Sequence, residues 1–173
     1  MMEQGNDFLK GQIHEAVLNH REFLQALEDH EAQADDARFR DLCTRYITTM
    51  QDHQRMLEDY ASEIGPPARD VPRSRDGAYR FSRDFADAVV QNDFQRLVDD
   101  SVMSARAEDA FRTFREAGRT LGLRHLAELG ETGEREHDSY KRDANRLAQQ
   151  MFVERARSDG SPGADHAFEE RAY

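Results

Sequence analysis

Apolar residues recur every three or four positions through long proline-free stretches of this chain, and this spacing constrains the fold more than any other feature. Between residues 36 and 64 the steps alternate strictly between four and three, through Phe39, Cys43, Tyr46, Met50, His53, Leu57, Tyr60 and Ile64. Such spacing places these side chains on one stripe of an α-helix. The first proline is Pro66, so no proline interrupts a helix before that point.

The same pattern predicts four long helices in two hairpins, at about residues 6–31, 36–64, 92–118 and 123–157. The polar stretch that begins at Glu31 marks the first turn, and Asp35 or Asp36 can cap the helix that follows. We expect the third helix to end in the stretch "GRTLGL", around Gly118 to Gly122. Four helices with one apolar stripe each bury those stripes most simply in an all-α four-helix bundle, here residues 1–157.

Residues 65–91 join the two hairpins, and three of the four prolines lie in them. A connection of this length can cross from one end of a bundle to the other, which would make the second and third helices parallel in a ferritin-like arrangement. A simple up-down-up-down bundle is the alternative. The polar segment 158–173 contains glycine and proline, and we expect it to be a flexible tail.

Charge and composition exclude several classes of function. Charged residues make up 34% of the 173 residues and the net charge is −11, so most of the surface must be acidic, and we expect no basic patch of the kind that phosphate contacts need. The single cysteine, Cys43, favours a reducing compartment. No secretory signal and no run of about 20 apolar residues is visible. We expect a cytoplasmic protein that binds no nucleic acid and inserts into no membrane, with a homo-oligomer or a protein partner left open.

Three of the seven histidines fall on the apolar stripes of three different helices: His20, His53 and His137. A buried imidazole needs a partner for its ring nitrogens. Each of these residues therefore either makes an internal hydrogen bond or binds a metal ion.

Carboxylates near one of these histidines suggest a metal site. If the second hairpin turns near residues 121–123, His137 lies level with Glu108 on the facing helix, and Glu134 lies one turn from His137. A Glu from one helix and Glu-x-x-His from its partner form half of a di-metal carboxylate site. Carboxylate and imidazole ligands suit iron, manganese or zinc.

The first hairpin supplies a less complete set of candidate ligands for the other half of such a site. If it turns near residue 34, His53 lies level with residues 14–17, which include Glu15 beside the stripe position Ala16. Three residues before His53, where a ligand Glu is expected, the chain has Met50. A thioether does not replace a bridging carboxylate, so the sequence indicates an eroded di-metal site.

Three stretches carry a family likeness: "ADDARFRDLCTRYITTMQDHQRMLEDYASEIGPP", "SARAEDAFRTFREA" and, less specifically, "GEREHDSYKRDANRL". In them the chain resembles the ferritin-like superfamily, and within it small bacterial four-helix-bundle families of unknown function, over about residues 8–155. The resemblance implies a ferritin-like bundle and, for related proteins, two metals used in iron oxidation, storage or peroxide removal. Carried over by position, the ligand set is Glu15, His53, Glu108, Glu134 and His137.

Three functions compete at this point. The eroded site favours a non-catalytic structural, stress-associated or partner-binding protein without a cofactor. The first alternative is a ferritin-like oxidase, peroxidase or iron-handling protein that binds iron or manganese. The second is a helical adaptor that docks through residues left outside the core, with the connection residues Phe81, Phe85, Val89 and Val90 as candidates.

Overall fold

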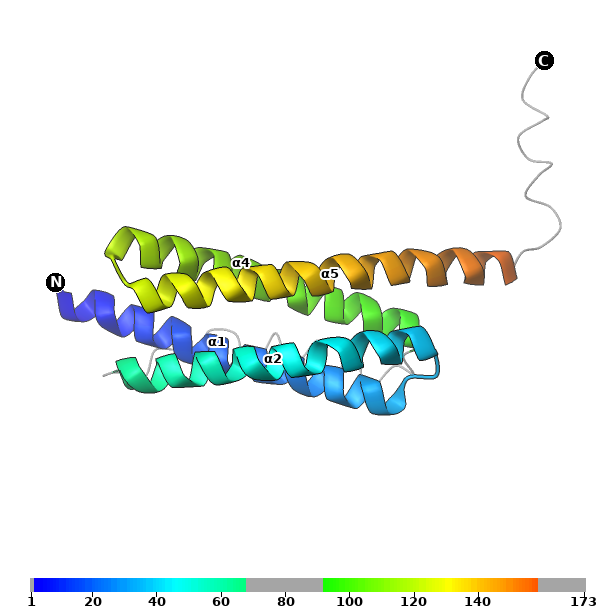
Figure 1. The fold of residues 1–173 in the computed structure, drawn as a ribbon, viewed down its shortest axis with the longest axis horizontal. Helices are drawn as coiled ribbons and strands as arrows, with labels where there is room; N and C mark the ends of the chain where they lie inside the picture. The colour runs from blue at the N-terminus through cyan, green and yellow to red at the C-terminus, as the bar shows by residue number, and fades with distance from the viewer. Residues whose placement is uncertain (1, 68–91, 159–173) are drawn as a thin grey trace, which may run out of the picture.

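The computed structural model of the protein describes residues 2–67 and 92–158, and within these ranges it contains four α-helices and no strand. The helices are α1 (Met2–Gln33), α2 (Ala37–Ile64), α4 (Asp93–Leu121) and α5 (Arg124–Ser158), as Figure 1 shows. The prediction of an all-α four-helix fold is therefore confirmed. The central part of the predicted connection, residues 68–91, lies outside the described residues, as do the four candidate docking residues in it and tail residues 159–173.

The ends of the helices follow local sequence signals. Asp36 caps α2, because its side chain accepts a hydrogen bond of 2.8 Å from the backbone N–H of Arg38. Asn92 and Gln95 form a reciprocal capping box at the start of α4. Two glycines with left-handed φ values, Gly65 at 72° and Gly122 at 70°, follow the ends of α2 and α4.

The break expected around Gly118 to Gly122 falls at the later of these glycines, since α4 runs on to Leu121 and Gly122 follows it. Gly118 instead lies against the backbone of Ala127 at the start of α5, where any side chain would overlap. This glycine permits close helix packing rather than termination, and the chain turn depends on Gly122.

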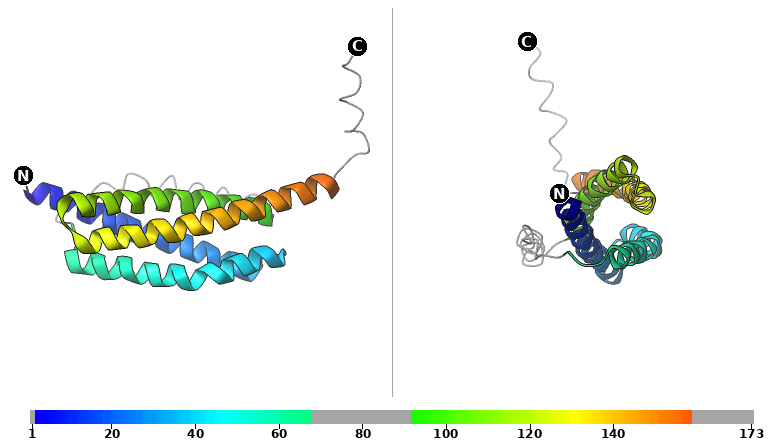
Figure 2. Two further views of the ribbon diagram at one scale, coloured as in Figure 1. Left: turned by 45° about the horizontal axis from the view of Figure 1, so that its top comes forward. Right: turned by 90° about the vertical axis from the view of Figure 1, so that its left-hand side faces the viewer.

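Contacts between the helix ends fix their directions. The backbone N–H of Asp36 donates to Asp93 Oδ2 at 2.7 Å, which joins the beginnings of α2 and α4. Arg38 pairs with Glu154 at 2.8 Å, which joins the beginning of α2 to the end of α5. Helices α2 and α4 therefore run parallel, and α2 runs antiparallel to α5. The end-on view in Figure 2 shows the α1–α2 hairpin beside the α4–α5 hairpin.

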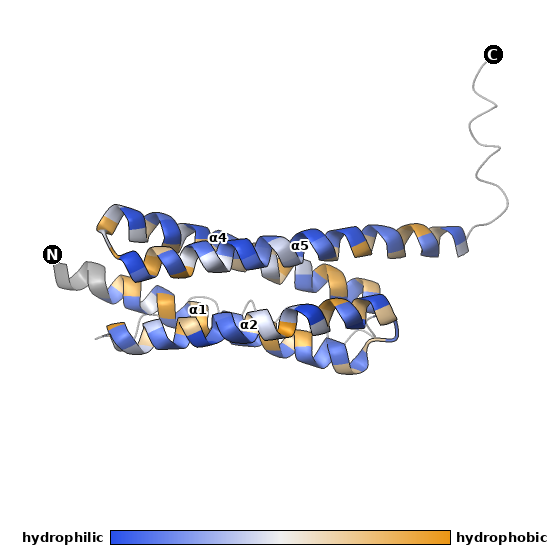
Figure 3. Cartoon of the chain, viewed as in Figure 1, coloured by the Kyte–Doolittle hydropathy of each residue, from blue (hydrophilic) through white to orange (hydrophobic). Residues whose placement is uncertain are grey.

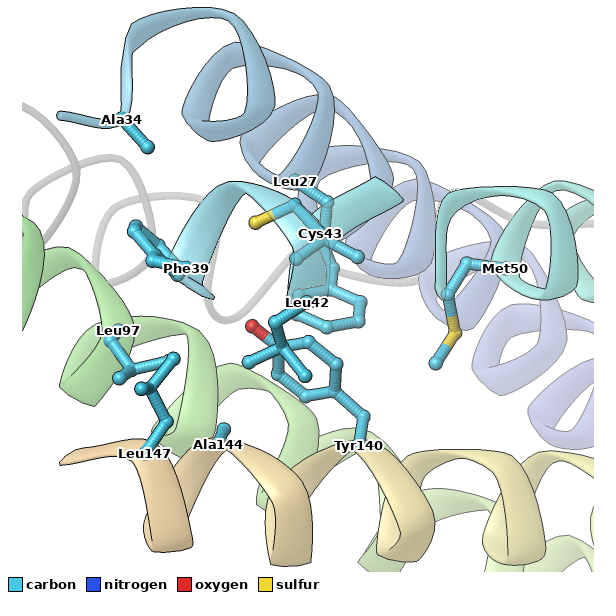
Figure 4. Close-up of a cluster of buried hydrophobic side chains, with 11 residues drawn as sticks. Leu27, Ala34, Phe39, Leu42, Cys43, Met50, Leu97, Tyr140, Ala144 and Leu147 are labelled. Carbon is cyan, nitrogen blue, oxygen red and sulfur yellow. The ribbon is translucent and has the colours of Figure 1, made fainter. Parts of the chain in front are cut away.

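The helices bury their apolar stripes against one another in two clusters. The first is centred on Phe23, Leu42 and Tyr140, and Figure 4 shows Tyr140 and Ala144 of α5 facing α2. The second is centred on Leu57 and Phe111. Hydrophobic positions recur at intervals along helices that are otherwise hydrophilic (Figure 3), and no described helix is both long and apolar enough to cross a membrane.

Candidate metal centre

The layer between the two apolar clusters is polar, and three histidines occupy it. His20 of α1, His53 of α2 and His137 of α5 each offer a ring nitrogen, and these nitrogens lie within 4.8 Å of one another. All three residues are buried, with exposed fractions of 2% or less. In the parts of the chain that the structure describes, this is the one group of three or more His, Cys, Asp or Glu side chains close enough to share a metal ion.

A glutamine orients the ring of His20. Gln54 Oε1 lies 2.9 Å from His20 Nδ1, while the amide nitrogen of Gln54 donates to Glu58 at 2.8 Å and to the Val17 carbonyl at 3.3 Å. Because the amide nitrogen faces these two acceptors, the amide oxygen faces His20, and His20 Nδ1 must carry the proton. The lone pair of His20 then lies on Nε2, which has no hydrogen-bond partner among the described residues.

A serine orients the ring of His137 in the same way. The hydroxyl of Ser104 on α4 donates to the backbone carbonyl of His137 at 2.9 Å, so its oxygen is left to accept from His137 Nδ1 at 3.2 Å. The proton of His137 is therefore on Nδ1. Its Nε2 carries the lone pair and is again unpartnered within the described structure.

The ring of His53 fits into space left by a glycine. A Cβ at Gly133 of α5 would lie 2.7 Å from His53 Nε2 and would overlap the neighbouring ring atoms. Neither ring nitrogen of His53 has a partner that meets strict hydrogen-bond geometry in the described residues, although the backbone carbonyl of Leu129 lies near enough to act as a weak acceptor and to raise the pKa of the ring. Gly133 is thus required for the position of His53 beside the other two rings.

Aromatic side chains close the site from two sides. Phe111 of α4 stacks on His137 with ring centroids 5.4 Å apart and an angle of 19°, and its centroid is 4.4 Å from that of His53. Phe23 of α1 lies 5.3 Å from His137. These rings separate the histidines from bulk solvent and lower the local dielectric, which strengthens any charge–dipole interaction inside.

Burial keeps the three imidazoles neutral. Loss of hydration lowers the pKa of His20 to about 4 and that of His53 to about 3, and it holds the pKa of His137 well below its ordinary value. A positive charge on His20 would further lower the pKa of both other rings. At pH 7 all three therefore retain the lone pairs that metal binding requires.

Three neutral imidazoles are a chemically specific ligand set. Imidazole nitrogen suits zinc, copper, nickel and iron, whereas manganese, magnesium and calcium favour oxygen. Tetrahedral Zn–N bonds of about 2.0–2.1 Å place ligand nitrogens roughly 3.3 Å apart. The rings already lie within 4.8 Å, so closing around an ion requires displacements on the order of 1 Å or somewhat more.

Two of the predicted carboxylate ligands, Glu108 and Glu134, lie near each other but form ion pairs with Arg and Lys side chains. Glu108 pairs with Arg112 at 2.6 Å and with Lys141. Glu134 pairs with Arg112 at 3.0 Å and with Arg115. These carboxylates therefore have partners of opposite charge at the edge of the α4–α5 hairpin, and neither belongs to the group of side chains close enough to share an ion.

Of the other predicted site residues, two join the histidine group and one does not. His53 and His137 meet, whereas Glu15 lines a groove between α1 and α4 and is not part of the histidine group. Met50 is fully buried in the first apolar cluster. His20 completes the group; its position on the apolar stripe indicated burial, but it was not among the predicted ligands, because the Glu-x-x-His pattern does not include it.

A second buried polar group is centred on Asp100, which lies one helical turn before Ser104 on α4. Asp100 Oδ2 accepts from His30 Nδ1 at 2.9 Å and from the Tyr140 hydroxyl at 3.2 Å. Burial raises the pKa of Asp100. These contacts join α1, α4 and α5, and we assign them a structural role.

No protein-family model, no curated protein and no solved structure matches this chain. The histidine layer is therefore the feature of this chain that points to a function.

Proposed function

We propose that this protein is a metal-binding four-helix bundle in which His20, His53 and His137 hold one transition-metal ion. The observation that carries this proposal is the orientation of two rings: Gln54 and Ser104 engage the Nδ1 protons, so that the Nε2 atoms of His20 and His137 present free lone pairs within one buried layer. Such hydrogen-bonded support of metal-binding histidines is general in metalloproteins, where it fixes the tautomer and the ring orientation.

Energetics support an occupant in this layer. Four ring nitrogens of the cluster lack hydrogen-bond partners among the described residues: Nε2 of His20, both nitrogens of His53 and Nε2 of His137. Each buried unsatisfied polar group costs about 1–3 kcal/mol. A metal ion would bind three of them at once and offset most of that cost.

A buried water molecule is the competing occupant. It could donate to two Nε2 atoms and accept from an N–H of His53, and polar buried sites of this kind commonly hold water. The protein would then be the non-catalytic structural bundle that the sequence favours. The two functions differ in one measurable property, which is retention of a stoichiometric metal ion.

The fold relation to ferritin-like proteins is part of the proposal. Parallel α2 and α4, with a long connection between them, match the single-crossover arrangement of ferritin-like bundles. The ligand set differs, because three imidazoles replace the carboxylate-rich di-metal set. We therefore propose a mononuclear nitrogen site and not a di-iron oxidase.

Metal content of the untagged full-length protein tests the proposal. Elemental analysis after loading with Zn²⁺ or Co²⁺ and desalting should give close to one ion per chain, and the Co²⁺ form should show the visible absorption of a tetrahedral nitrogen site. Alanine substitution of His20, His53 or His137 should abolish retention. His14→Ala and His125→Ala are the matched controls, since His14 bonds the carbonyl of Lys10 in its own helix and His125 is exposed.

Two results would reject this assignment. Wild-type protein that retains no metal while its helical signal is intact would favour the water-filled bundle. Close to two ions per chain, lost on Glu134→Gln, would favour the di-metal carboxylate site.

A further inference from the structure

We infer that the bound ion keeps an open coordination position, and that a groove between α1 and α4 leads a small anion of two or three non-hydrogen atoms to it. This inference rests on the proposed metal site and adds to it the class of exogenous ligand and its route.

The ligand count leaves a position open. The three histidines come from α1, α2 and α5, and no fourth His, Cys, Asp or Glu of the described chain joins them. Helix α4 therefore contributes no ligand of these types, and Ser104 on α4 is already engaged with His137. Three protein ligands with a free fourth position are the arrangement of catalytic rather than structural zinc sites.

The groove reaches the cluster from the side on which α4 lies. Its volume is about 620 Å³, and among the described residues its lining comes from α1 and α4. His20, Phe23 and Phe111 lie at its inner side, which follows from their burial. Of the three histidines, His20 is the one that lines the groove.

Small side chains leave the space between the two walls of the groove unfilled. Ala16 projects from α1, and Ala107 and Ala110 project from α4. His20 is only 2% exposed and its Nε2 is buried, so within the described structure no open passage joins the groove to the position of the ion. Entry therefore requires small shifts of the side chains at the inner side, which selects small molecules. The rim carries both signs of charge, with Glu15, Arg106 and Asp109.

Charge balance selects an anion. Three neutral imidazoles leave the two positive charges of a divalent ion uncompensated in a site with a low dielectric, which is energetically costly. Glu108 and Glu134, the nearest predicted carboxylate ligands, are already paired with Arg or Lys. A monoanion in the open position removes part of that cost, and a bound cation correspondingly favours the anionic form of a small ligand.

Azide binding to the Co²⁺-loaded full-length protein tests this inference. Azide should change the visible spectrum with a saturating one-to-one titration. Ala107→Phe fills the groove and should slow azide association by about tenfold or more without changing the Co²⁺ content. Ala117→Phe is the matched control, because Ala117 is another partly buried alanine of α4 that does not line the groove.

A second variant protects the test against a folding failure. Ala110→Phe lies on the same wall and should slow association in the same direction. A Co²⁺-loaded protein without a spectral response to azide would overturn the open position and leave the metal site standing. Unchanged association in both groove variants would overturn the route. Absence of bound Co²⁺ in the wild type would instead reject the proposed function itself.

Discussion

Gly133 of α5 lies directly against the imidazole of His53, so that a Cβ at this glycine would come within 2.7 Å of His53 Nε2. The absence of one side chain on α5 thus positions the ring of His53 on α2, one of the three proposed ligands. We expect Gly133→Ala to displace His53 and to lower Zn²⁺ affinity by about 10–100-fold, the range found when support of a metal ligand is disturbed. A competition titration with a chromophoric chelator measures this change.

Gly130→Ala is the matched control for this substitution. A Cβ at Gly130 would lie 2.6 Å from the Phe111 carbonyl oxygen and would overlap the backbone of Arg115, and none of the three atoms nearest to it belongs to a histidine. We expect both variants to unfold at lower urea concentration, and only Gly133→Ala to lose specific affinity for zinc. Equal zinc affinity in the two folded variants would contradict the role of Gly133.

Gln54 determines which nitrogen of His20 is free. Gln54→Leu removes the acceptor for His20 Nδ1 and should lower zinc affinity by about 10–100-fold. Gln51→Leu, one turn earlier on α2, removes a comparable contact to Glu28 of α1 at 3.1 Å and should leave affinity unchanged. Isothermal titration of both variants with Zn²⁺ makes the comparison, and identical affinities would rule out an orienting function for Gln54.

His53→Leu should raise the stability of the metal-free protein. Both ring nitrogens of His53 are buried without hydrogen-bond partners in the described chain, and replacing such a group with an apolar side chain of similar size removes a cost of about 1–3 kcal/mol. The variant should also lose the stabilisation by zinc, which for the wild type is about 2.7 kcal/mol at a hundredfold excess over Kd. Urea unfolding with and without a chelator gives both quantities. A less stable metal-free variant would instead indicate that His53 is satisfied by water.

Acid should destabilise the metal-free protein through the histidine layer. The pKa of His20 is about 4 in the folded protein and near 6.5 when unfolded, so between these values the unfolded chain binds a proton that the folded chain does not. The free energy of unfolding therefore falls as the pH falls from about 6.5 towards 4, by on the order of 3 kcal/mol from His20 alone. His53, with a folded pKa of about 3, acts in the same direction. Urea unfolding at several pH values should show a flatter dependence in His20→Leu than in the wild type.

Glu134→Gln separates the two forms of metal site. Glu134 is paired with Arg112 and Arg115, and partly exposed ion pairs contribute about 0–1 kcal/mol. We expect this variant to keep one zinc per chain and nearly full stability. Loss of metal in a folded Glu134→Gln protein would support the carboxylate ligands predicted from the sequence.

The helical stripes could be predicted because burial repeats with the period of the helix. His20, His53 and His137 all lie inside the core, as their stripe positions indicate. The spacing of apolar residues within one helix does not determine which residues of a neighbouring helix lie opposite them. The loop between Gln33 and Ala37 is centred about one residue later than assumed. Helical side chains also lean about one position towards the start of their helix. Together these shifts bring His53 level with His20 instead of Ala16.

The carboxylates illustrate a different limit. Glu108 and Glu134 were expected near His137 because of their distance along the helices, but distance along the chain does not specify partners. Arg112 follows Glu108 by four residues, a spacing that favours an ion pair on one helix. The neutralising partners from α5 and α4, Lys141 and Arg115, become apparent only when the two helices are packed together.

The distribution of ligands over the two hairpins has a consequence for cooperativity. Close packing at Gly118 and Gly130 binds α4 tightly to α5, whereas the two hairpins contact each other more sparsely. His20 and His53 belong to one hairpin and His137 to the other. An ion held by all three acts as a cross-link between two units that would otherwise separate by sub-global opening, and amide hydrogen exchange of α1 and α2 should slow when it binds.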